Sequence, residues 1–405
     1  MNAVIEREAW ADPEPERERL GVRIARLGAV ALGLGHLGLF LAVALGQRDR
    51  LWFSYLWAFG VASQIAVGSL FLLGLGHLTR SVWGLGMRRL LEGFAWLCGP
   101  LALLAIPIGV SVFVHAPLYP WTHADHFDEV IAGKAPYLDP AFFVLRLVVF
   151  FLGFALFARV FVRASLAQDA GRDPVGQARR ARRYAPAFFL FFGPAVTFAA
   201  VDLFMSLEPH WFSTIFGVYV FAGMFATAVA SLTLAVLWAR ERGLLRPDLV
   251  RRDHLYSLGA WLFATACFWA YIAFSQFMLI WYGNLPEETA WYARRLEGGF
   301  GPWAIALVLC RFVLPFFLLM SRRAKMNPRV LRAAAIVALA GGFLDVGFLV
   351  LPAAPDGSVL VDAAAFLLVF GALGLPLARF ARRHPWVCVR DPRLEDCRAF
   401  HLEGG

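Results

Sequence analysis

Residues 141–163 read AFFVLRLVVFFLGFALFARVFVR, and residues 185–207 read APAFFLFFGPAVTFAAVDLFMSL. Each stretch is long enough to cross a hydrocarbon layer about 30 Å thick as a single helix, which takes about 20 residues. The first stretch holds Arg146 and the second holds Asp202. A charged side chain inside a membrane segment is costly, so such a residue is a functional-site hypothesis. These two stretches therefore indicate both a membrane fold and a candidate site.

The composition extends this pattern to the whole chain. Of 405 residues, 60% are hydrophobic and only 17% are charged, which is too apolar for a soluble protein of this size. Ten stretches are long enough to span a membrane: 23–46, 52–77, 91–114, 141–163, 185–207, 211–239, 255–282, 301–321, 330–351 and 359–380. Backbone groups in lipid must pair within their own segment, which favours helices. We predict an all-α integral membrane protein with ten transmembrane helices.

Basic residues are distributed unevenly between the predicted loops. Loops 163–184, 240–254 and 322–329 are rich in arginine, whereas the loops on the opposite side are nearly bare. The positive-inside rule then places both tails, 1–22 and 381–405, in the cytoplasm. Ten spans require the termini to share a side, so the two arguments agree. The net charge of +9 comes from these loops and does not indicate nucleic-acid binding.

Spans two to five resemble spans six to nine. A tryptophan precedes the intramembrane arginine by 50 residues in both sets, with Trp96 before Arg146 and Trp261 before Arg311. In both sets the next apolar stretch carries an aspartate, at Asp345 in the second set, and a proline follows the aspartate after seven residues. Matched order and matched spacing indicate an internal duplication, which is common in membrane folds.

The duplication predicts a domain organisation. Two tandem four-helix bundles are expected at 52–207 and 211–351, and single flanking helices at 23–46 and 359–380. Parallel repeats place their sites within or between the two halves. The buried charges are therefore expected inside the bundles rather than on their surface.

Each predicted bundle carries one arginine and one aspartate at similar depth in its outer half. Arg146 follows Pro140 by six residues, or about 9 Å of helix, and Asp202 precedes Pro209 by seven residues, or about 10 Å. An arginine cannot lose its proton, so it pairs with the aspartate or holds water. The pair is either a neutralised contact that fixes packing or a proton relay in which the carboxylate titrates. The repetition favours the relay.

Four further polar residues extend the predicted proton path. Gln64 lies near mid-membrane, His77 and Glu92 lie at the inner ends of the second and third spans, and Gln276 lies in the outer half of the seventh. Each alone is typical of a helix–helix contact. Together they supply steps between the cytoplasm and the aspartates.

The outer loops hold a second group of polar residues. Glu208 and His210 link the fifth and sixth spans, and Glu287 and Glu288 follow the seventh. Among many aromatic residues, this motif is typical of membrane-interface anchoring and of a docking surface. We assign no catalytic residue to it.

The five cysteines predict no cofactor of the chain's own. None forms C-x-x-C or C-x-x-C-H, so a covalently bound haem or an iron–sulfur cluster is not expected. Cys388 and Cys397 lie in a predicted cytoplasmic tail, where a disulfide is not expected either. We predict no metal site and no cofactor bound by this chain.

Two motifs resemble those of a known family. DLFMSLEPHWFSTIFG at 202–217 and AFSQFMLIWYGNLPEE at 273–288 are similar to the ActF-type membrane subunit of bacterial alternative complex III, a member of the NrfD-like, polysulfide-reductase membrane-subunit group. The resemblance covers all ten spans. It implies two four-helix bundles with flanking helices, in the bacterial inner membrane.

The resemblance also implies a function and partners. Such complexes are quinol:electron-acceptor oxidoreductases of respiratory or photosynthetic electron transport. The implied partners are a sister NrfD-like membrane subunit, an iron–sulfur/molybdopterin-like peripheral subunit and c-type cytochromes, which hold the clusters and the haem c. Quinol is a possible ligand of this subunit. By resemblance, Asp202 and Asp345 carry a proton path, with Arg146 and Arg311 beside them.

We therefore predict a subunit that scaffolds the complex and conducts protons while its partners move electrons. A stand-alone proton-coupled secondary transporter is the alternative, because ten spans, parallel halves and buried charges suit it equally. Transporters often use paired broken helices at mid-membrane, and the sequence shows no matched pair of breakers. A membrane anchor without a quinone or proton role is the third interpretation.

Overall fold

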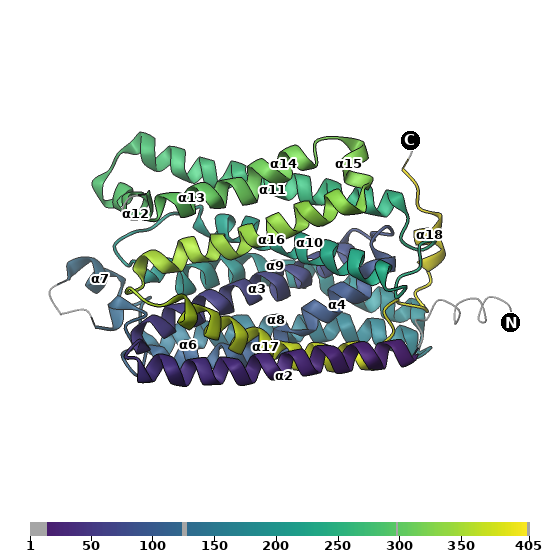
Figure 1. The fold of residues 1–405 in the computed structure, drawn as a ribbon, viewed down its shortest axis with the longest axis horizontal. Coiled ribbons are helices and arrows are strands. Elements are labelled where there is room, and N and C mark those ends of the chain that lie inside the picture. Colours follow the sequence, from purple (N-terminus) through teal and green to yellow (C-terminus); the bar gives the residue numbers. More distant parts are fainter. Residues whose placement is uncertain (1–13, 124–127, 297–298, 403–405) are drawn as a thin grey trace.

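The computed structural model describes residues 14–123, 128–296 and 299–402, and the regular secondary structure of this part of the chain is all helical, without a strand. Ten of its helical segments are long and apolar enough to span a membrane, which confirms the all-α membrane fold. They run side by side along the long axis of the molecule (Figure 1). Each expected apolar stretch overlaps one of these segments, although the stretch 211–239 begins five residues before its helix, which starts at Phe216.

The bounds of the spans are as follows. The first five are α2 (Glu14–Ala44), α3 (Arg48–Leu78), η1 with α4, α5 and α6 (Leu85–Met87, Arg88–Trp96, Cys98–Leu104, Ile106–Ser111), α8 (Pro140–Asp169), and α9 with η3 (Pro174–Leu203, Met205–Leu207). The second five are α10 (Phe216–Glu241), α11 (Arg252–Gly283), α13 with η4 and α14 (Gly301–Val308, Leu309–Val313, Leu314–Leu318), α16 with η5 (Pro328–Val350, Leu351–Ala353), and α17 (Val359–Arg383). Shorter elements lie in the connections: η2 (Pro120–Thr122), α7 (Glu129–Lys134), α12 (Pro286–Leu296), α15 (Arg322–Met326) and α18 (Leu394–Ala399).

Several spans begin at a polar residue followed by proline. Asp139 accepts a hydrogen bond from the backbone N–H of Phe142 at the start of α8, and Asp173 and Asn327 cap α9 and α16 in the same way. The side-chain oxygen satisfies a free N–H of the first turn, and a proline in the first turn has no N–H to satisfy. This sequence signal fixes where α8 enters its bundle and hence where Arg146 lies.

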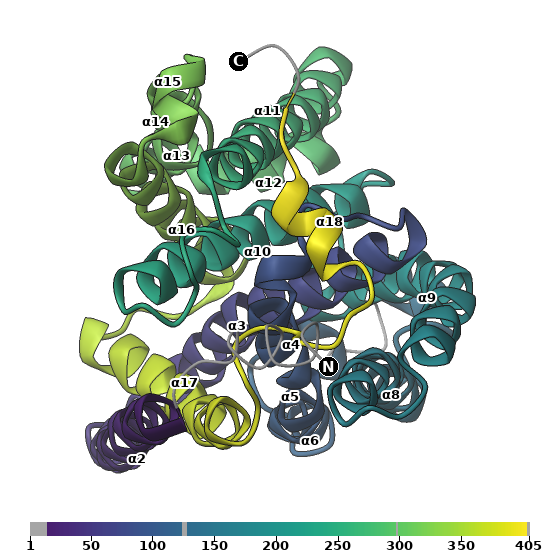
Figure 2. The ribbon, with the colours of Figure 1, turned by 90° about the vertical axis from the view of Figure 1, so that its right-hand side faces the viewer.

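The spans pack in two groups of four. In the first group α3 and α8 contact each other and also the α4–α6 segment and α9. In the second group α11 and α16 contact each other and also α10 and the α13–α14 segment. The two groups meet where α3 packs against α10, α9 against α10, and α3 against α16 (Figure 2). The backbones of α3 and α10 approach closely, because a Cβ added at Gly68 would lie 2.8 Å from the carbonyl oxygen of Met224.

The two groups differ in helix regularity. The third span breaks into short helices at Leu97 and Ala105, whereas its counterpart in the second group, α11, is continuous. The eighth span contains a π-helical turn at Leu309–Val313, whereas its counterpart α8 is continuous. The interruptions therefore do not occupy equivalent places in the two halves.

The flanking helices α2 and α17 form a pair along one side of the molecule (Figure 1). A second view shows that α17 lies between α2 and α3 (Figure 2). Their contact depends on glycine, because a Cβ added at Gly371 would lie 2.5 Å from the backbone nitrogen of Leu32 and 2.9 Å from the carbonyl oxygen of Gly28. Small residues let membrane helices approach this closely and pack without a polar contact.

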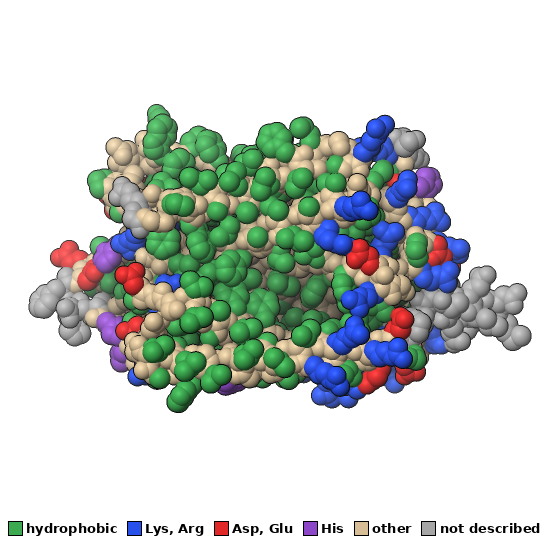
Figure 3. All heavy atoms as spheres, in the orientation of Figure 1, with side chains coloured by type: hydrophobic (Ala, Val, Ile, Leu, Met, Phe, Trp, Pro, Cys, Tyr) green, Lys and Arg blue, Asp and Glu red, His purple; other side chains and the backbone are tan. Residues whose placement is uncertain are grey.

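Basic side chains gather at one end of the molecule. In the face shown, hydrophobic side chains cover the middle, and lysine and arginine cluster at the end that carries α15, α18 and the start of α2 (Figure 3). We call this the arginine-rich end. The described ends of the chain, Glu14 and Leu402, therefore lie at the same end of the bundles.

The glycine contact predicts a local loss of stability. Replacing Gly371 by Val should separate α17 from α2 and lower the free energy of unfolding by about 1–3 kcal/mol. Gly33 on α2 is the matched control, because a Cβ there meets nothing within 4 Å. Thermal unfolding of the full chain in detergent measures both variants. Equal losses for Gly371→Val and Gly33→Val would show that the α2–α17 contact contributes nothing.

Candidate functional site

The first bundle holds its arginine and aspartate as a two-pronged ion pair. Arg146 on α8 donates from Nε to Oδ2 of Asp202 at 2.8 Å and from Nη2 to Oδ1 at 3.0 Å. Both side chains are buried. The guanidinium lies over the rings of Tyr137 and Phe142, 3.9 and 4.3 Å from the ring centres. The Nη1 atom of Arg146 has no hydrogen-bond partner among the described atoms.

The second bundle holds a more extensively connected pair. Arg311 donates from Nη2 to Oδ2 of Asp345 at 3.0 Å, and the Tyr219 hydroxyl donates to the other carboxylate oxygen. The same Nη2 lies 3.0 Å from Oγ1 of Thr227 and 3.4 Å from Oε1 of Gln64. Thr227 in turn donates to Gln64 at 2.6 Å. Because Gln64 belongs to α3, this network joins the two bundles.

Glycines on α10 and α16 make room for the second pair. A Cβ at Gly223 would lie 2.3 Å from Oδ2 of Asp345, and a Cβ at Gly342 would lie 2.5 Å from Oγ1 of Thr227. Arg311 itself lies in the π-helical turn of the eighth span. Such turns occur frequently at functional sites. The local sequence therefore accepts a less regular helix and two glycines where the charges meet.

The two pairs occupy equivalent positions in the fold. In the first bundle the arginine lies on α8 and the aspartate on α9, the third and fourth helices of that bundle. In the second bundle the arginine lies in the α13–α14 segment and the aspartate on α16, again the third and fourth of their group. A guanidinium keeps its charge, so removal of the carboxylate leaves a buried unpaired charge, at a cost of about 3–5 kcal/mol. Each pair is thus structurally required whether or not it also moves protons.

Glu92 lies in a second charged group at the arginine-rich end. Its carboxylate is fully buried and accepts from Arg88 Nε at 3.1 Å and from Arg89 Nη1 at 2.6 Å. Arg88 also donates to Asp391 of the C-terminal segment at 2.6 Å, and Arg89 pairs with Asp169 of α8. We call these five residues the inner cluster. It fastens the C-terminal segment to the first bundle.

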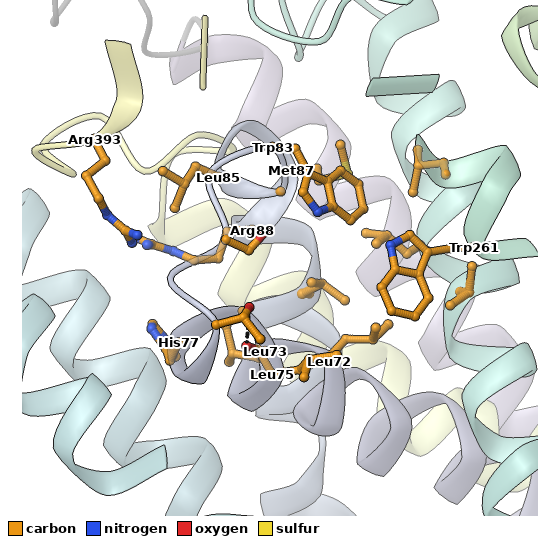
Figure 4. A pocket seen from close by; sticks show the side chains of 18 residues that line it. Leu72, Leu73, Leu75, His77, Trp83, Leu85, Met87, Arg88, Trp261 and Arg393 are labelled. Carbon is orange, nitrogen blue, oxygen red and sulfur yellow. Dashed lines mark hydrogen bonds between the residues drawn. The ribbon is translucent and has the colours of Figure 1, made fainter. Parts of the chain in front are cut away.

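His77 lies beside a cavity next to this cluster (Figure 4). The cavity has a volume of about 240 Å³ and lies between α3, α4, α10 and α11. Arg88 and Arg393 line it near His77, and Trp261 lines the opposite side. The Nε2 atom of His77 is buried and has no hydrogen-bond partner among the described residues. His77 therefore lines the cavity, but its Nε2 atom meets water only after the side chain moves.

Gln276 lies at the edge of a larger cavity in the second bundle. This lateral cleft has a volume of about 710 Å³ and lies between α11, α12 and the eighth span. Gln276 accepts from Ser213 at 3.1 Å and donates to the Tyr292 hydroxyl at 3.2 Å. The walls are mainly aromatic and include Trp269 and Trp291. The cleft reaches the second pair, because Tyr219 lines it while donating to the aspartate.

Glu208 takes part in a buried contact at the end opposite to the arginine-rich end. It accepts from Arg295 at 2.6 Å and lies 3.1 Å from Arg294. Arg295 is only 1% exposed and also donates to the carbonyl oxygen of Phe348 at 3.0 Å. Its guanidinium lies 3.5 Å from the ring centre of Trp291. These contacts hold α12 against both bundles.

The other residues of the outer-loop motif are more exposed. His210 lies 2.8 Å from Asp128 at the start of α7. The backbone N–H of Ile131 and the nearby His210 keep the pKa of Asp128 below its usual value. Glu287 and Glu288 lie in the first turn of α12, where a negative charge stabilises the helix. The four residues of the predicted outer-loop motif, Glu208, His210, Glu287 and Glu288, therefore have separate partners and do not form one site.

Two buried contacts have no signal in the sequence. The Sγ atom of Cys397 lies 3.5 Å from Nε2 of His254 and accepts from the N–H of Gly86 at 3.3 Å. Arg295 is buried although it follows the seventh span in a predicted outer loop. Within residues 14–123, 128–296 and 299–402, no three His, Cys, Asp or Glu side chains are placed to share a metal ion.

The comparison with models of known protein families gives no match. The comparison with curated proteins gives none either. The functional argument therefore rests on the residues and their geometry.

Burial of the tail cysteines predicts slow thiol chemistry. Burial raises the pKa of Cys388 and of Cys397 to about 11. Since the thiolate is the reactive form, only about one thiol in a thousand is ionised at pH 8. Both cysteines should resist alkylation in the folded protein and react after unfolding, as measured by peptide mass spectrometry. Labelling at pH 8 as fast as in denaturant would show that the C-terminal segment is not packed as described.

Proposed function

We propose that this chain is a membrane subunit of a quinol:electron-acceptor oxidoreductase of the alternative complex III type, in the bacterial inner membrane. In this proposal it scaffolds the complex and conducts protons through its bundles. The observation that carries the proposal is the pair of buried Arg–Asp contacts at equivalent positions of two four-helix groups. Two charged pairs inside a membrane protein are costly, and intramembrane charges typically mark ion or proton pathways.

The chemistry divides between this chain and its partners. Oxidation of a quinol releases two electrons and two protons. The electrons need redox centres, and we assign these to the haem c and iron–sulfur clusters of cytochrome and peripheral subunits. The protons need titratable groups along a path, and Asp202 and Asp345 are such groups. A sister membrane subunit completes the proposed assembly.

The proposed path begins at the arginine-rich end, which the positive-inside rule assigns to the cytoplasm. Glu92 and His77 are the first residues, and Gln64 with Thr227 leads to Asp345. His77 and Gln64 lie 13 residues apart on α3, or about 20 Å, so water molecules must fill that interval. The arginine beside each aspartate stabilises the carboxylate that is left when a proton moves on.

The lateral cleft is the proposed place where quinol approaches this subunit. Its aromatic walls suit a flat ring, and Gln276, Tyr292 and Tyr219 offer hydrogen bonds at its polar side. Small-molecule sites typically combine mainly apolar walls with a few placed polar groups. Tyr219 connects such a ring to Asp345, so the cleft and the second pair form one continuous arrangement.

A stand-alone proton-coupled secondary transporter is the second candidate, favoured by one buried charge pair in each half. Transporters of this kind often place broken helices at corresponding positions of their two halves. Here the interruptions lie in the third and the eighth spans, which do not correspond. This difference favours the complex subunit.

Purification under mild conditions separates the two candidates. We expect the full chain, extracted from its native membrane in a gentle detergent, to bring c-type cytochromes with it, visible by their absorption. The wash conditions are set with an unrelated multi-pass protein of the same membrane, which should carry no haem. A chain that elutes alone and free of haem absorption would contradict the complex-subunit proposal.

Substitution of the aspartates tests the proton path. Asp202→Asn and Asp345→Asn should each lower proton release per quinol oxidised, and turnover should fall about tenfold or more because a positioned proton acceptor is lost. Asp362→Asn is the matched control, since Asp362 of the flanking helix α17 pairs with Arg50 at 2.9 Å and belongs to neither of the two buried pairs. Proton release is followed with a pH dye in the assembled, reconstituted complex.

The proton-release measurement is valid only for variants that still assemble into the complex. Intact cytochrome content shows that each variant is built into the complex, and the double variant Arg311→Gln/Asp345→Asn removes both charges together where the single variant does not assemble. Normal proton release in assembled Asp202→Asn and Asp345→Asn would assign both pairs to packing alone.

A further inference from the structure

A cavity lined by arginines lies between α8 and α9 near the arginine-rich end. Its volume is about 690 Å³. Four arginines line it: Arg159, Arg163, Arg172 and Arg180. All four side chains are exposed, and no acidic side chain lines the cavity. This concentration of positive charge is not used by the proposed proton path.

The arginines of this cavity differ from other arginines at the same end. Arg246 pairs with Asp248, Arg332 with Glu241, and Arg382 with Glu18; these three contacts are typical of surface salt bridges. By contrast, among the described residues no carboxylate lies within salt-bridge distance of the four cavity arginines. The acidic residues closest in sequence are engaged elsewhere, because Asp169 pairs with Arg89 and Asp173 caps α9. The cavity therefore presents several positive charges that have no counter-ion within the described part of the chain.

Helix geometry places the cavity at the edge of the hydrocarbon layer. Pro140 begins α8, and Arg159 follows 19 residues later, or about 29 Å along the helix, which is about the thickness of the hydrocarbon. Arg163 lies one turn further, at the level of the lipid headgroups. Leu156 and Val160 line the same cavity on its apolar side.

This combination identifies the ligand by its chemistry. Guanidinium groups bind phosphate through paired hydrogen bonds, and apolar side chains on the membrane side suit acyl chains. Basic pockets between transmembrane helices at this level bind phospholipid headgroups. Four unpaired positive charges exceed what one phosphate neutralises. We propose that the cavity binds an anionic phospholipid that carries two phosphate groups, taken from the leaflet at the arginine-rich end.

A lipid is preferred to free phosphate because of the cavity walls. Free phosphate has no use for an apolar side, and a shallow site exposed to water would bind it weakly. A diphosphate lipid satisfies the arginines and covers Leu156 and Val160 with hydrocarbon. The bound lipid would then fasten α8 to α9, the two helices that carry Arg146 and Asp202.

The test compares two double substitutions with the same change in charge. Arg163→Gln/Arg180→Gln removes two cavity arginines, whereas Arg179→Gln/Arg183→Gln removes two exposed arginines of α9 that do not line the cavity. The full chain, with the partners it retains, is purified in a neutral detergent. It is titrated with cardiolipin, phosphatidylglycerol or inorganic phosphate, and bound lipid is counted by native mass spectrometry.

We expect one tightly held cardiolipin in the natural protein and in the control variant. The cavity variant should bind it about thirtyfold more weakly, since each basic residue near an anionic lipid contributes a factor of about five. Phosphatidylglycerol should bind less tightly, and inorganic phosphate should not displace the lipid. Unfolding temperatures without added lipid check that both variants are folded, and Arg159→Gln/Arg172→Gln, which removes the other two cavity arginines, replaces the cavity variant if it is not.

Equal cardiolipin binding in the cavity and control variants would overturn the proposal. Equal affinity for phosphatidylglycerol would overturn the assignment of a two-phosphate lipid. Displacement of the lipid by inorganic phosphate would show a site for the free anion instead.

Discussion

A guanidinium cannot lose its proton, so an arginine inside a membrane protein must have its counter-charge within reach. This constraint determines the interior of both bundles. Arg146 has its carboxylate at 2.8 Å and aromatic rings on its other side, and Arg311 has its carboxylate at 3.0 Å. The helix that carries each arginine must face the helix that carries the aspartate. The packing order within each group of four follows from that requirement.

The duplicated pairs share a position but not their surroundings. The first pair is more closed, because both carboxylate oxygens of Asp202 accept hydrogen bonds from Arg146, at 2.8 and 3.0 Å. The second pair is part of a network that includes Tyr219, Thr227 and a residue of the other bundle. In a network of hydroxyl groups, a proton can pass when the hydroxyl groups rotate and exchange hydrogen bonds. In a closed pair, a hydrogen bond between the arginine and the aspartate must break first. The two bundles are therefore unequal in what they offer a proton, although their topology is the same.

The sequence was sufficient for the parts of the structure that depend on local patterns. Apolar length located the ten spans, and the recurring arginine and aspartate located the two pairs. The inner cluster was partly visible, since Arg88 and Arg89 lie four and three residues before Glu92, a spacing at which helix side chains meet. Arg295 and the contact of Cys397 with a distant histidine carried no such signal. They depend on segments that meet only in the folded chain, and a single sequence does not reveal such meetings.

The junction of the bundles has consequences for the second pair. Gln64 reaches Arg311 from α3, and Gly68 on the same helix packs against α10 with no room for a side chain. A shift of one bundle against the other would therefore strain a close backbone contact and break the hydrogen bond to the arginine together. Since interiors packed this densely do not deform continuously, the two bundles are expected to move as one body. In the proposed function, proton movement at the second aspartate then requires side-chain rotation and water rather than rocking of the two halves, which is how a fixed subunit of a larger complex would work.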